Sequence, residues 1–194
     1  TIGNIVYPIG TVVIGNNGGV GFGSIPFQNL PPLNEPIPSS SAFGGGQAML
    51  AFWDDIDDKC GDVYFEQRGD RLIVQWEDRP LGSDPQQHVT FQLQVLENPN
   101  VAGLMAQLIF ADIEQPAAGG GISATIGYQD GGAGYGDLQW SFNTSGAVSN
   151  GTALSFVVMD PMPTVSEWGL IILMLLLTTA GTLVFRRRRY RVSA

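Results

Sequence analysis

One segment constrains this chain more than any other: a run of 18 uncharged residues, WGLIILMLLLTTAGTLVF, from Trp168 to Phe185. At a rise of about 1.5 Å per residue, a helix of this length extends about 27 Å, enough to cross the hydrocarbon core of a bilayer. A core helix is the alternative, but such a helix is amphipathic and does not run into RRRRYR. The sequence therefore predicts one transmembrane α-helix over residues 168–185.

The basic residues predict how that helix is oriented. Five of the nine cations follow it directly, namely Arg186, Arg187, Arg188, Arg189 and Arg191. Clustered arginines stay on the cytoplasmic side of a membrane. We therefore expect residues 186–194 to form a cytoplasmic tail, residues 160–167 a linker, and residues 1–159 a domain on the opposite side.

The composition of the body excludes several classes of protein. Residues 1–163 hold 17 carboxylates against four cations. Nucleic-acid binding needs a basic face, so the body is not expected to bind nucleic acid. The chain has one cysteine and one histidine, which excludes an internal disulfide framework and any zinc site with two histidines.

The body has the pattern of a β-protein. From Val89 to Val95, apolar and polar residues alternate with period 2, which predicts a half-buried strand. Two further strands, Asp62–Gln67 and Arg71–Trp76, flank a short turn and predict a hairpin. Five other short segments bounded by turn residues read as strands: Ala48–Trp53, Leu104–Ala111, Ile122–Tyr128, Leu138–Phe142 and Leu154–Met159. The expected fold is mainly β, an antiparallel β-sandwich of about eight or nine strands.

Two remaining segments are ambiguous or irregular. Leu104–Phe110 is also compatible with a short helix, although the neighbouring turns favour a strand. Residues 29–46 contain four prolines and are expected to form a long surface loop.

The densest polar cluster allows two interpretations. Five carboxylates fall within nine residues: Asp54, Asp55, Asp57, Asp58 and Asp62. Oxygen ligands at this density suit calcium. The spacing fails the EF-hand pattern, however, because Lys59 and Cys60 occupy a ligand position and the glycine position. We favour the interpretation that this segment is a solvated acidic turn, and a calcium-binding site is the alternative.

No catalytic constellation is evident. His88 would need a nucleophile or a carboxylate beside it, and sequence alone places neither. Cys60 lies among carboxylates, which disfavour its thiolate. Four acidic residues are candidates in principle for glycoside hydrolysis, Glu66, Glu77, Asp78 and Glu97, but nothing in the sequence pairs them. Three tryptophans fall on expected strands, Trp53, Trp76 and Trp140, where core packing is favoured over sugar stacking. We expect no enzyme and, calcium aside, no cofactor.

The C-terminal segment PTVSEWG, an apolar run and an arginine cluster together resemble the bacterial IPTL-CTERM sorting signal. Its motif residues here are Pro163, Thr164, Val165, Ser166, Glu167, Trp168 and Gly169. Met162 and Val165 replace the usual isoleucine and leucine. The resemblance implies a bacterial envelope protein and an exosortase as a possible partner.

The body is similar to bacterial surface β-sandwiches related to the nidogen-like extracellular domain. The segments that carry the similarity are Ala51–Asp57, Arg71–Pro80, Thr90–Asn98, Ser123–Asp130 and Ser149–Phe156. This resemblance implies an adhesive or structural module without known chemistry.

Three functions follow as hypotheses. The favoured one is a non-enzymatic, single-pass accessory or structural subunit of a larger bacterial inner-membrane assembly, such as a photosynthetic or respiratory complex, with its acidic domain in the periplasm. Small residues of the span, Thr178, Thr179, Gly181 and Thr182, would let integral membrane subunits pack closely within the lipid bilayer. The alternatives are an exosortase-sorted surface or matrix adhesin and, less favoured, a carbohydrate-active enzyme.

Overall fold

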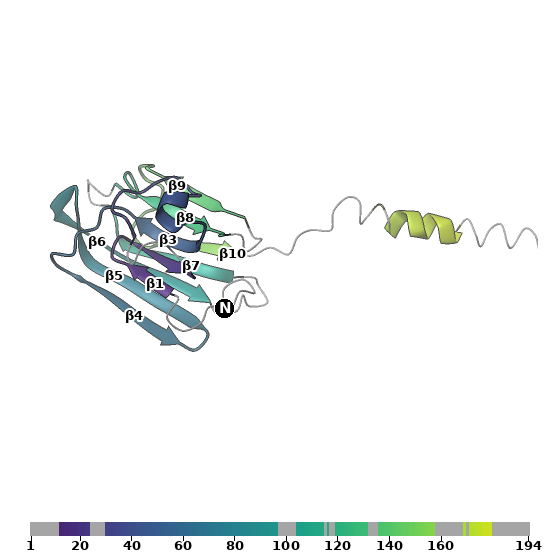
Figure 1. Ribbon diagram of the computed structural model, residues 1–194, viewed down its shortest axis with the longest axis horizontal. Helices are drawn as coiled ribbons and strands as arrows, with labels where there is room; N and C mark the ends of the chain where they lie inside the picture. Colours follow the sequence, from purple (N-terminus) through teal and green to yellow (C-terminus); the bar gives the residue numbers. More distant parts are fainter. Residues whose placement is uncertain are drawn as a thin grey trace, which may run out of the picture. The chain divides into compact units, whose positions relative to one another are not determined.

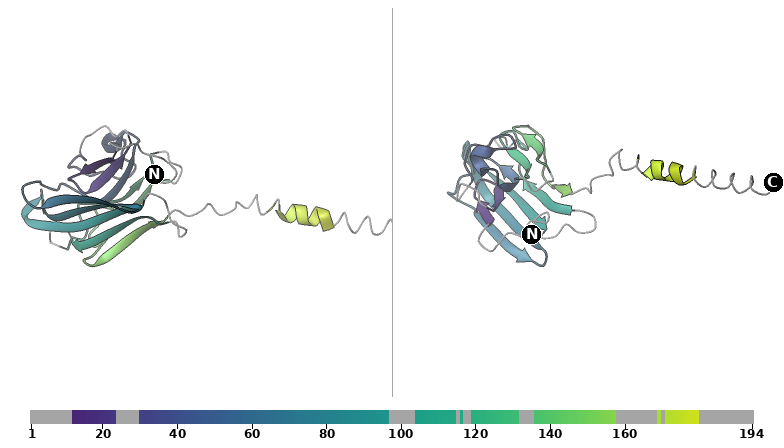
Figure 2. Two further views of the ribbon diagram at one scale, coloured as in Figure 1. Left: turned by 90° about the horizontal axis from the view of Figure 1, so that it is seen from below. Right: turned by 45° about the vertical axis from the view of Figure 1, so that its right-hand side comes forward.

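A computed structural model describes residues 12–23, 30–96, 104–114, 116, 119–131, 136–157, 169 and 171–179. The chain divides into two compact units, Thr1–Val158 and Met159–Ala194. The first unit holds two antiparallel sheets of five strands each, which Figures 1 and 2 show as two facing layers. The expected β-sandwich is confirmed in this form.

The first sheet has the strand order β1-β2-β3-β8-β9. Its strands are β1 (Val12–Gly15), β2 (Gly19–Phe22), β3 (Gln47–Trp53), β8 (Thr125–Gln129) and β9 (Leu138–Phe142). The second sheet has the order β10-β7-β6-β5-β4. Its strands are β4 (Asp62–Arg68), β5 (Arg71–Leu81), β6 (Asp84–Leu96), β7 (Leu104–Asp112) and β10 (Thr152–Val157).

The second sheet is built from consecutive hairpins, and β6 shows why it folds as it does. Val89, Phe91, Leu93 and Val95 are buried between the sheets, whereas Thr90, Gln92 and Gln94 are half-buried on the outer face. This alternation confirms the period-2 prediction. The predicted hairpin is also confirmed, since β4 and β5 pair from Asp62–Glu77 to Arg68–Arg71. Leu104–Phe110 is part of strand β7 rather than a helix.

The two sheets are tied together by Trp76 of β5. Its side chain is fully buried, stacks on Phe91 with 5.0 Å between ring centroids, and donates its Nε1–H to the Gly15 carbonyl of β1 at 2.9 Å. A buried indole needs such an acceptor. The hydrogen bond therefore joins one sheet to the other through the middle of the core.

Strand β3 is buried on both faces, because part of the long surface loop expected over residues 29–46 packs against it. All seven of its residues are buried. On its outer side, Leu30 and Phe43 form a second apolar cluster with Trp53, and the Trp53 indole donates to the Pro31 carbonyl at 2.8 Å. Phe43 belongs to a four-residue helix, α1 (Ser40–Phe43), whose N-cap is Ser39. The loop thus covers the sheet, which explains the unbroken apolar run of β3.

Strands β1 and β2 were not predicted. They form a tight hairpin whose turn contains Gly18, with φ of +84°. The Gly18 carbonyl accepts hydrogen bonds from the backbone of Ala51 and Phe52 of β3. A Cβ at Gly18 would lie 2.0 Å from the Phe52 carbonyl oxygen. Only glycine combines this backbone conformation with this close approach.

In the second unit, residues 169 and 171–179 are helical and exposed. Among the described residues, no helix is long and apolar enough to cross a membrane. The remainder of the expected span, including Gly181 and Thr182, and the arginine cluster Arg186–Arg191 lie outside the described residues.

Candidate functional site

The five aspartates of the acidic turn follow β3, but their side chains have different partners. Asp54 is buried, accepts a hydrogen bond from the Ser123 hydroxyl at 2.5 Å, and also accepts from the backbone N–H of Asp55. Burial raises the pKa of Asp54 above its usual range. Asp57 instead forms an ion pair with Lys59, whose ammonium group lowers the pKa of that carboxyl.

The other three aspartates, Asp55, Asp58 and Asp62, are exposed. Asp62 accepts from the Tyr64 hydroxyl at 3.2 Å. Across the described part of the chain, no three His, Cys, Asp or Glu side chains are arranged to hold a metal ion. The arrangement therefore adds no support to the calcium alternative, and the carboxylates serve local contacts.

A groove of about 600 Å³ crosses the outer face of β4, β5 and β6. It is lined by two aromatic residues, one ion pair, one isoleucine and three glutamines: Tyr64, Phe65, Glu66, Arg68, Ile73, Gln75, Gln92 and Gln94. Tyr64 is 53% exposed. Its hydrogen bond to Asp62 raises the pKa of the Tyr64 phenol, so the hydroxyl keeps its proton.

Three amides of the groove form one directional chain of hydrogen bonds. Arg71 donates to Gln94 at 2.8 Å, and Gln94 donates to Gln92 at 2.7 Å. Gln92 donates to Gln75 at 2.9 Å, and Gln75 donates to Glu77 at 3.0 Å.

The two ends of this chain determine its direction. A guanidinium only donates and an ionised carboxylate only accepts, so each amide between Arg71 and Glu77 must point its oxygen toward the first and its nitrogen toward the second. Each amide uses one N–H and one lone pair within the chain. Each amide therefore keeps one further N–H and one further oxygen lone pair that this chain of hydrogen bonds does not use, and both are held in a fixed orientation.

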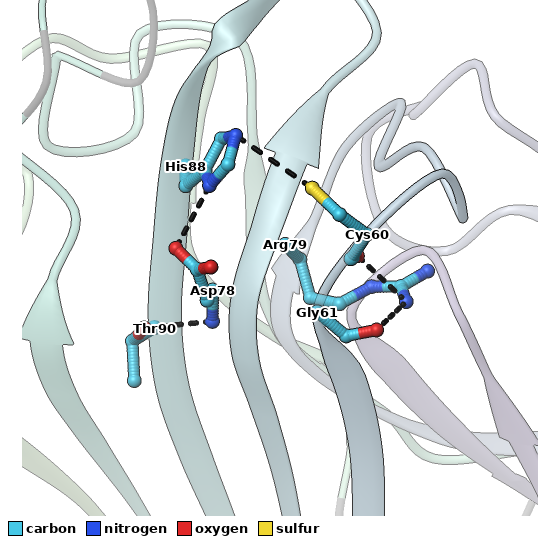
Figure 3. Close-up of polar contacts among 6 residues, drawn as sticks. All are labelled: Cys60, Gly61, Asp78, Arg79, His88 and Thr90. Carbon is cyan, nitrogen blue, oxygen red and sulfur yellow. Dashed lines mark hydrogen bonds and ion pairs between the residues drawn. The ribbon is translucent and has the colours of Figure 1, made fainter.

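The only cysteine and the only histidine of the chain meet at the end of the same sheet (Figure 3). The Cys60 Sγ lies 3.7 Å from Nε2 of His88, and Nδ1 of His88 lies 2.8 Å from Oδ1 of Asp78. Cys60 is exposed, and the His88 side chain is 30% exposed. A thiol, an imidazole and a carboxylate in this order form the arrangement in which a base activates a nucleophile. Sequence reasoning treated the three residues separately and missed it.

The backbone of β5 holds this arrangement in place. The pairing of β5 with β6 shifts register between Trp76 and Arg79, and Asp78 within this bulge has φ of +54°. Bulges re-aim side chains in this way. The backbone N–H of Asp78 donates to the Thr90 hydroxyl at 3.0 Å. The bulge therefore directs the Asp78 carboxylate toward His88.

The cysteine segment is pressed against the same bulge. A Cβ at Gly61 would lie 2.3 Å from the carbonyl oxygens of Glu77 and Asp78, so only glycine permits this approach. Arg79 is buried and donates Nη1–H to the carbonyls of Cys60 and Gly61, at 3.3 and 3.1 Å. These contacts fix the backbone that carries the thiol.

The remaining candidates are placed apart from these sites. Trp53 and Trp76 are fully buried, as core packing predicts, whereas Trp140 of β9 is 56% exposed. Glu97 and the motif residues Pro163, Thr164, Val165, Ser166, Glu167 and Trp168 lie outside the described residues. Gly169 and Thr178 are helical, and the Thr178 hydroxyl donates to the Met174 carbonyl within its own helix.

Two antiparallel sheets define a β-sandwich domain, followed by a separate C-terminal segment. The chain matches the NIDO-related family over residues 8–163, and it belongs to this family. Residues 161–189 match the IPTL-CTERM motif. Both resemblances stated from the sequence are thereby confirmed. No curated protein and no solved structure matches the chain.

Proposed function

We propose that the chain is an exosortase-sorted surface protein of the bacterial envelope and that its sandwich is a non-enzymatic adhesive module. The observation that carries this proposal is the order of the two matches: the IPTL-CTERM motif begins where the NIDO-related domain ends. Neither match points to an accessory subunit of an inner-membrane complex. We therefore favour the sorted surface protein, which was an alternative hypothesis from the sequence, over the inner-membrane subunit.

In this proposal the apolar run 168–185 crosses the inner membrane before processing. Arg186–Arg191 holds the C-terminus in the cytoplasm, and the sandwich lies on the outer side. An exosortase then recognises the segment Pro163–Gly169 and separates the sandwich from its membrane segment.

Mass spectrometry of the C-terminus, combined with membrane fractionation of the native host, tests the sorting. The expected product ends at or near Pro163–Gly169 and leaves the inner-membrane fraction. Replacing Pro163 and Trp168 by alanine should retain the full chain in that fraction. The matched control replaces the same residue types in the sandwich, Pro85 and Trp140, and should be processed normally. A mature wild-type protein that still ends at Ala194 would contradict the proposal.

The groove over β4–β6 is the proposed adhesive site, and its ligand is a neutral polysaccharide. Each amide of the Arg71–Glu77 chain offers one donor and one acceptor side by side, which matches the hydroxyl groups of a sugar. Strands lie about 4.8 Å apart, so Gln75 and Gln92 present these pairs at neighbouring positions. Tyr64 adds an exposed aromatic ring at one edge. The strong excess of carboxylates in the body disfavours anionic polymers.

Affinity electrophoresis of the sandwich-bearing chain in gels containing neutral or anionic polysaccharides tests this ligand class. Gln92→Ala interrupts the amide chain at its centre and should weaken retention about tenfold, because two oriented amides lose their partner. Gln107→Ala on β7, outside the groove, is the matched control and should change retention less than about twofold. Retention by an anionic polymer alone, or by no polymer, would refute the neutral-glycan site.

A further inference from the structure

Beyond adhesion, we propose that Cys60 is a reactive thiol that forms mixed disulfides by exchange with disulfide-bearing molecules outside the cell. His88 is its proton acceptor, and Asp78 is a positioning residue for His88. The contacts of 3.7 Å and 2.8 Å that join these three side chains carry the inference. The thiol chemistry does not depend on the groove, and the location of the exchange outside the cell rests on the proposed function.

The geometry assigns each nitrogen of His88 one role. Asp78, as a carboxylate, accepts a hydrogen bond, so Nδ1 of His88 carries the proton of that contact. Nε2 then has a free lone pair directed toward Cys60 and accepts the thiol proton. The products of this transfer are a thiolate and an imidazolium, and the imidazolium is stabilised by Asp78 on its other side.

A buried cation holds the backbone of the segment that carries the thiol. Arg79 is 5% exposed, and its Nε has no hydrogen-bond partner. Among the ion pairs of the described residues, none involves Arg79. The guanidinium donates instead to the carbonyls of Cys60 and Gly61. A positive charge held in the same segment favours the thiolate over the thiol.

Three of the five aspartates near Cys60 in the sequence have other partners in the structure. Asp54 is buried against Ser123, and Asp57 is paired with Lys59. Asp62 receives the Tyr64 hydroxyl. The side chain that contacts the Cys60 sulfur is His88 of β6, which in turn contacts Asp78 of β5. Arg79 of β5 contacts the Cys60 backbone, and Asp58 and Lys59 precede Cys60 in its own turn.

The exchange step is balanced without a further reagent. The Cys60 thiolate attacks one sulfur of an external disulfide, a new sulfur–sulfur bond forms, and the old one breaks. The departing thiolate takes the proton that His88 received from Cys60. Cys60 is oxidised to a mixed disulfide with one half of the external molecule, and the other half leaves as a thiol. His88 returns to its neutral form.

The test measures the rate at which the full-length chain reacts with the aromatic disulfide DTNB between pH 5 and pH 9. At pH 6–7 the wild type should react about tenfold faster than N-acetylcysteine, because Nε2 of His88 lies in contact with the Cys60 sulfur and accepts its proton. His88→Gln should lower the rate to that of the free thiol and move the pH profile to the alkaline range. Asp78→Asn, which suits the positive φ at this position, should lower the rate about threefold at pH 6–7 and leave the alkaline limb unchanged.

Glu114→Gln, an exposed carboxylate outside the groove and the thiol cluster, is the matched control and should react as the wild type does. Mass spectrometry after incubation with oxidised glutathione should show one glutathionyl group on Cys60 and none on Cys60→Ser. Two results overturn the proposal: a wild-type rate equal to that of N-acetylcysteine at pH 6–7, or a His88→Gln rate equal to the wild type across the pH range. Thermal melting of each variant separates a lost contact from lost folding.

Discussion

Replacing Trp76 by phenylalanine tests whether the indole of β5 holds the two sheets together. Phenylalanine keeps the stacking on Phe91 but removes the donor to the buried Gly15 carbonyl. A buried acceptor left without a partner costs about 1–3 kcal/mol. The smaller ring also leaves a cavity of roughly 40 Å³, which adds about 1 kcal/mol. The expected loss of unfolding free energy is therefore about 2–4 kcal/mol.

Urea and thermal unfolding of the full-length chain, followed by far-ultraviolet circular dichroism, measure this loss. For a domain of this size the melting temperature should fall by about 5–15 °C. Trp140→Phe is the matched control, because Trp140 also donates its Nε1–H to a backbone carbonyl, that of Ala147, but is 56% exposed. Water replaces that donor, so the control should lose less than about 0.5 kcal/mol. Equal losses in the two variants would refute the bridging role of Trp76.

Three further predictions concern other parts of the sandwich. Because burial raises the pKa of Asp54, the folded state holds the Asp54 proton more tightly than the unfolded state does, and the free energy of unfolding falls as pH rises from the ordinary pKa of 3.8 through the raised pKa. The urea midpoint of Asp54→Asn should lack this decline. Parallel curves of urea midpoint against pH for the wild type and Asp54→Asn would contradict the prediction. Gly18→Ala places a Cβ against the Phe52 carbonyl and should destabilise the domain by more than about 3 kcal/mol in the same unfolding assay, whereas Gly151→Ala, with φ of +74° and open space around it, should cost about 1 kcal/mol. Chelation by EDTA should leave the melting temperature unchanged, and a decrease that Asp55→Asn with Asp57→Asn abolishes would restore the calcium alternative.

The sequence predicted the second sheet well because each of its strands carries its own signal. The alternation in β6 and the turn between Arg68 and Arg71 are local patterns. Strands β1 and β2 were missed because Gly19-Val20-Gly21-Phe22 has little β-propensity. The turn residues Asn16-Asn17-Gly18 between two apolar stretches were the available hairpin signal.

The thiol cluster was beyond sequence reasoning for a different reason. Cys60, Asp78 and His88 meet only through the pairing of β5 with both neighbours and through the bulge at Asp78. A one-residue change of register would send the Asp78 side chain to the other face. The register, and therefore the cluster, follows from the packing of two sheets that no local pattern specifies.

The pairing of β3 with β8 has a consequence for the order in which the domain acquires its structure. Strands β4 to β7 follow one another as hairpins, so they form from contacts close in the chain and can fold rapidly as the polypeptide emerges. Strand β3 precedes all of them, yet Trp53 pairs with Thr125 beyond them. The edge of β3 that pairs with β8 therefore stays unpaired until the last third of the domain has been synthesised. A chain exported from its N-terminus is most exposed to aggregation in this interval, because an unpaired strand edge is a template for pairing with another chain.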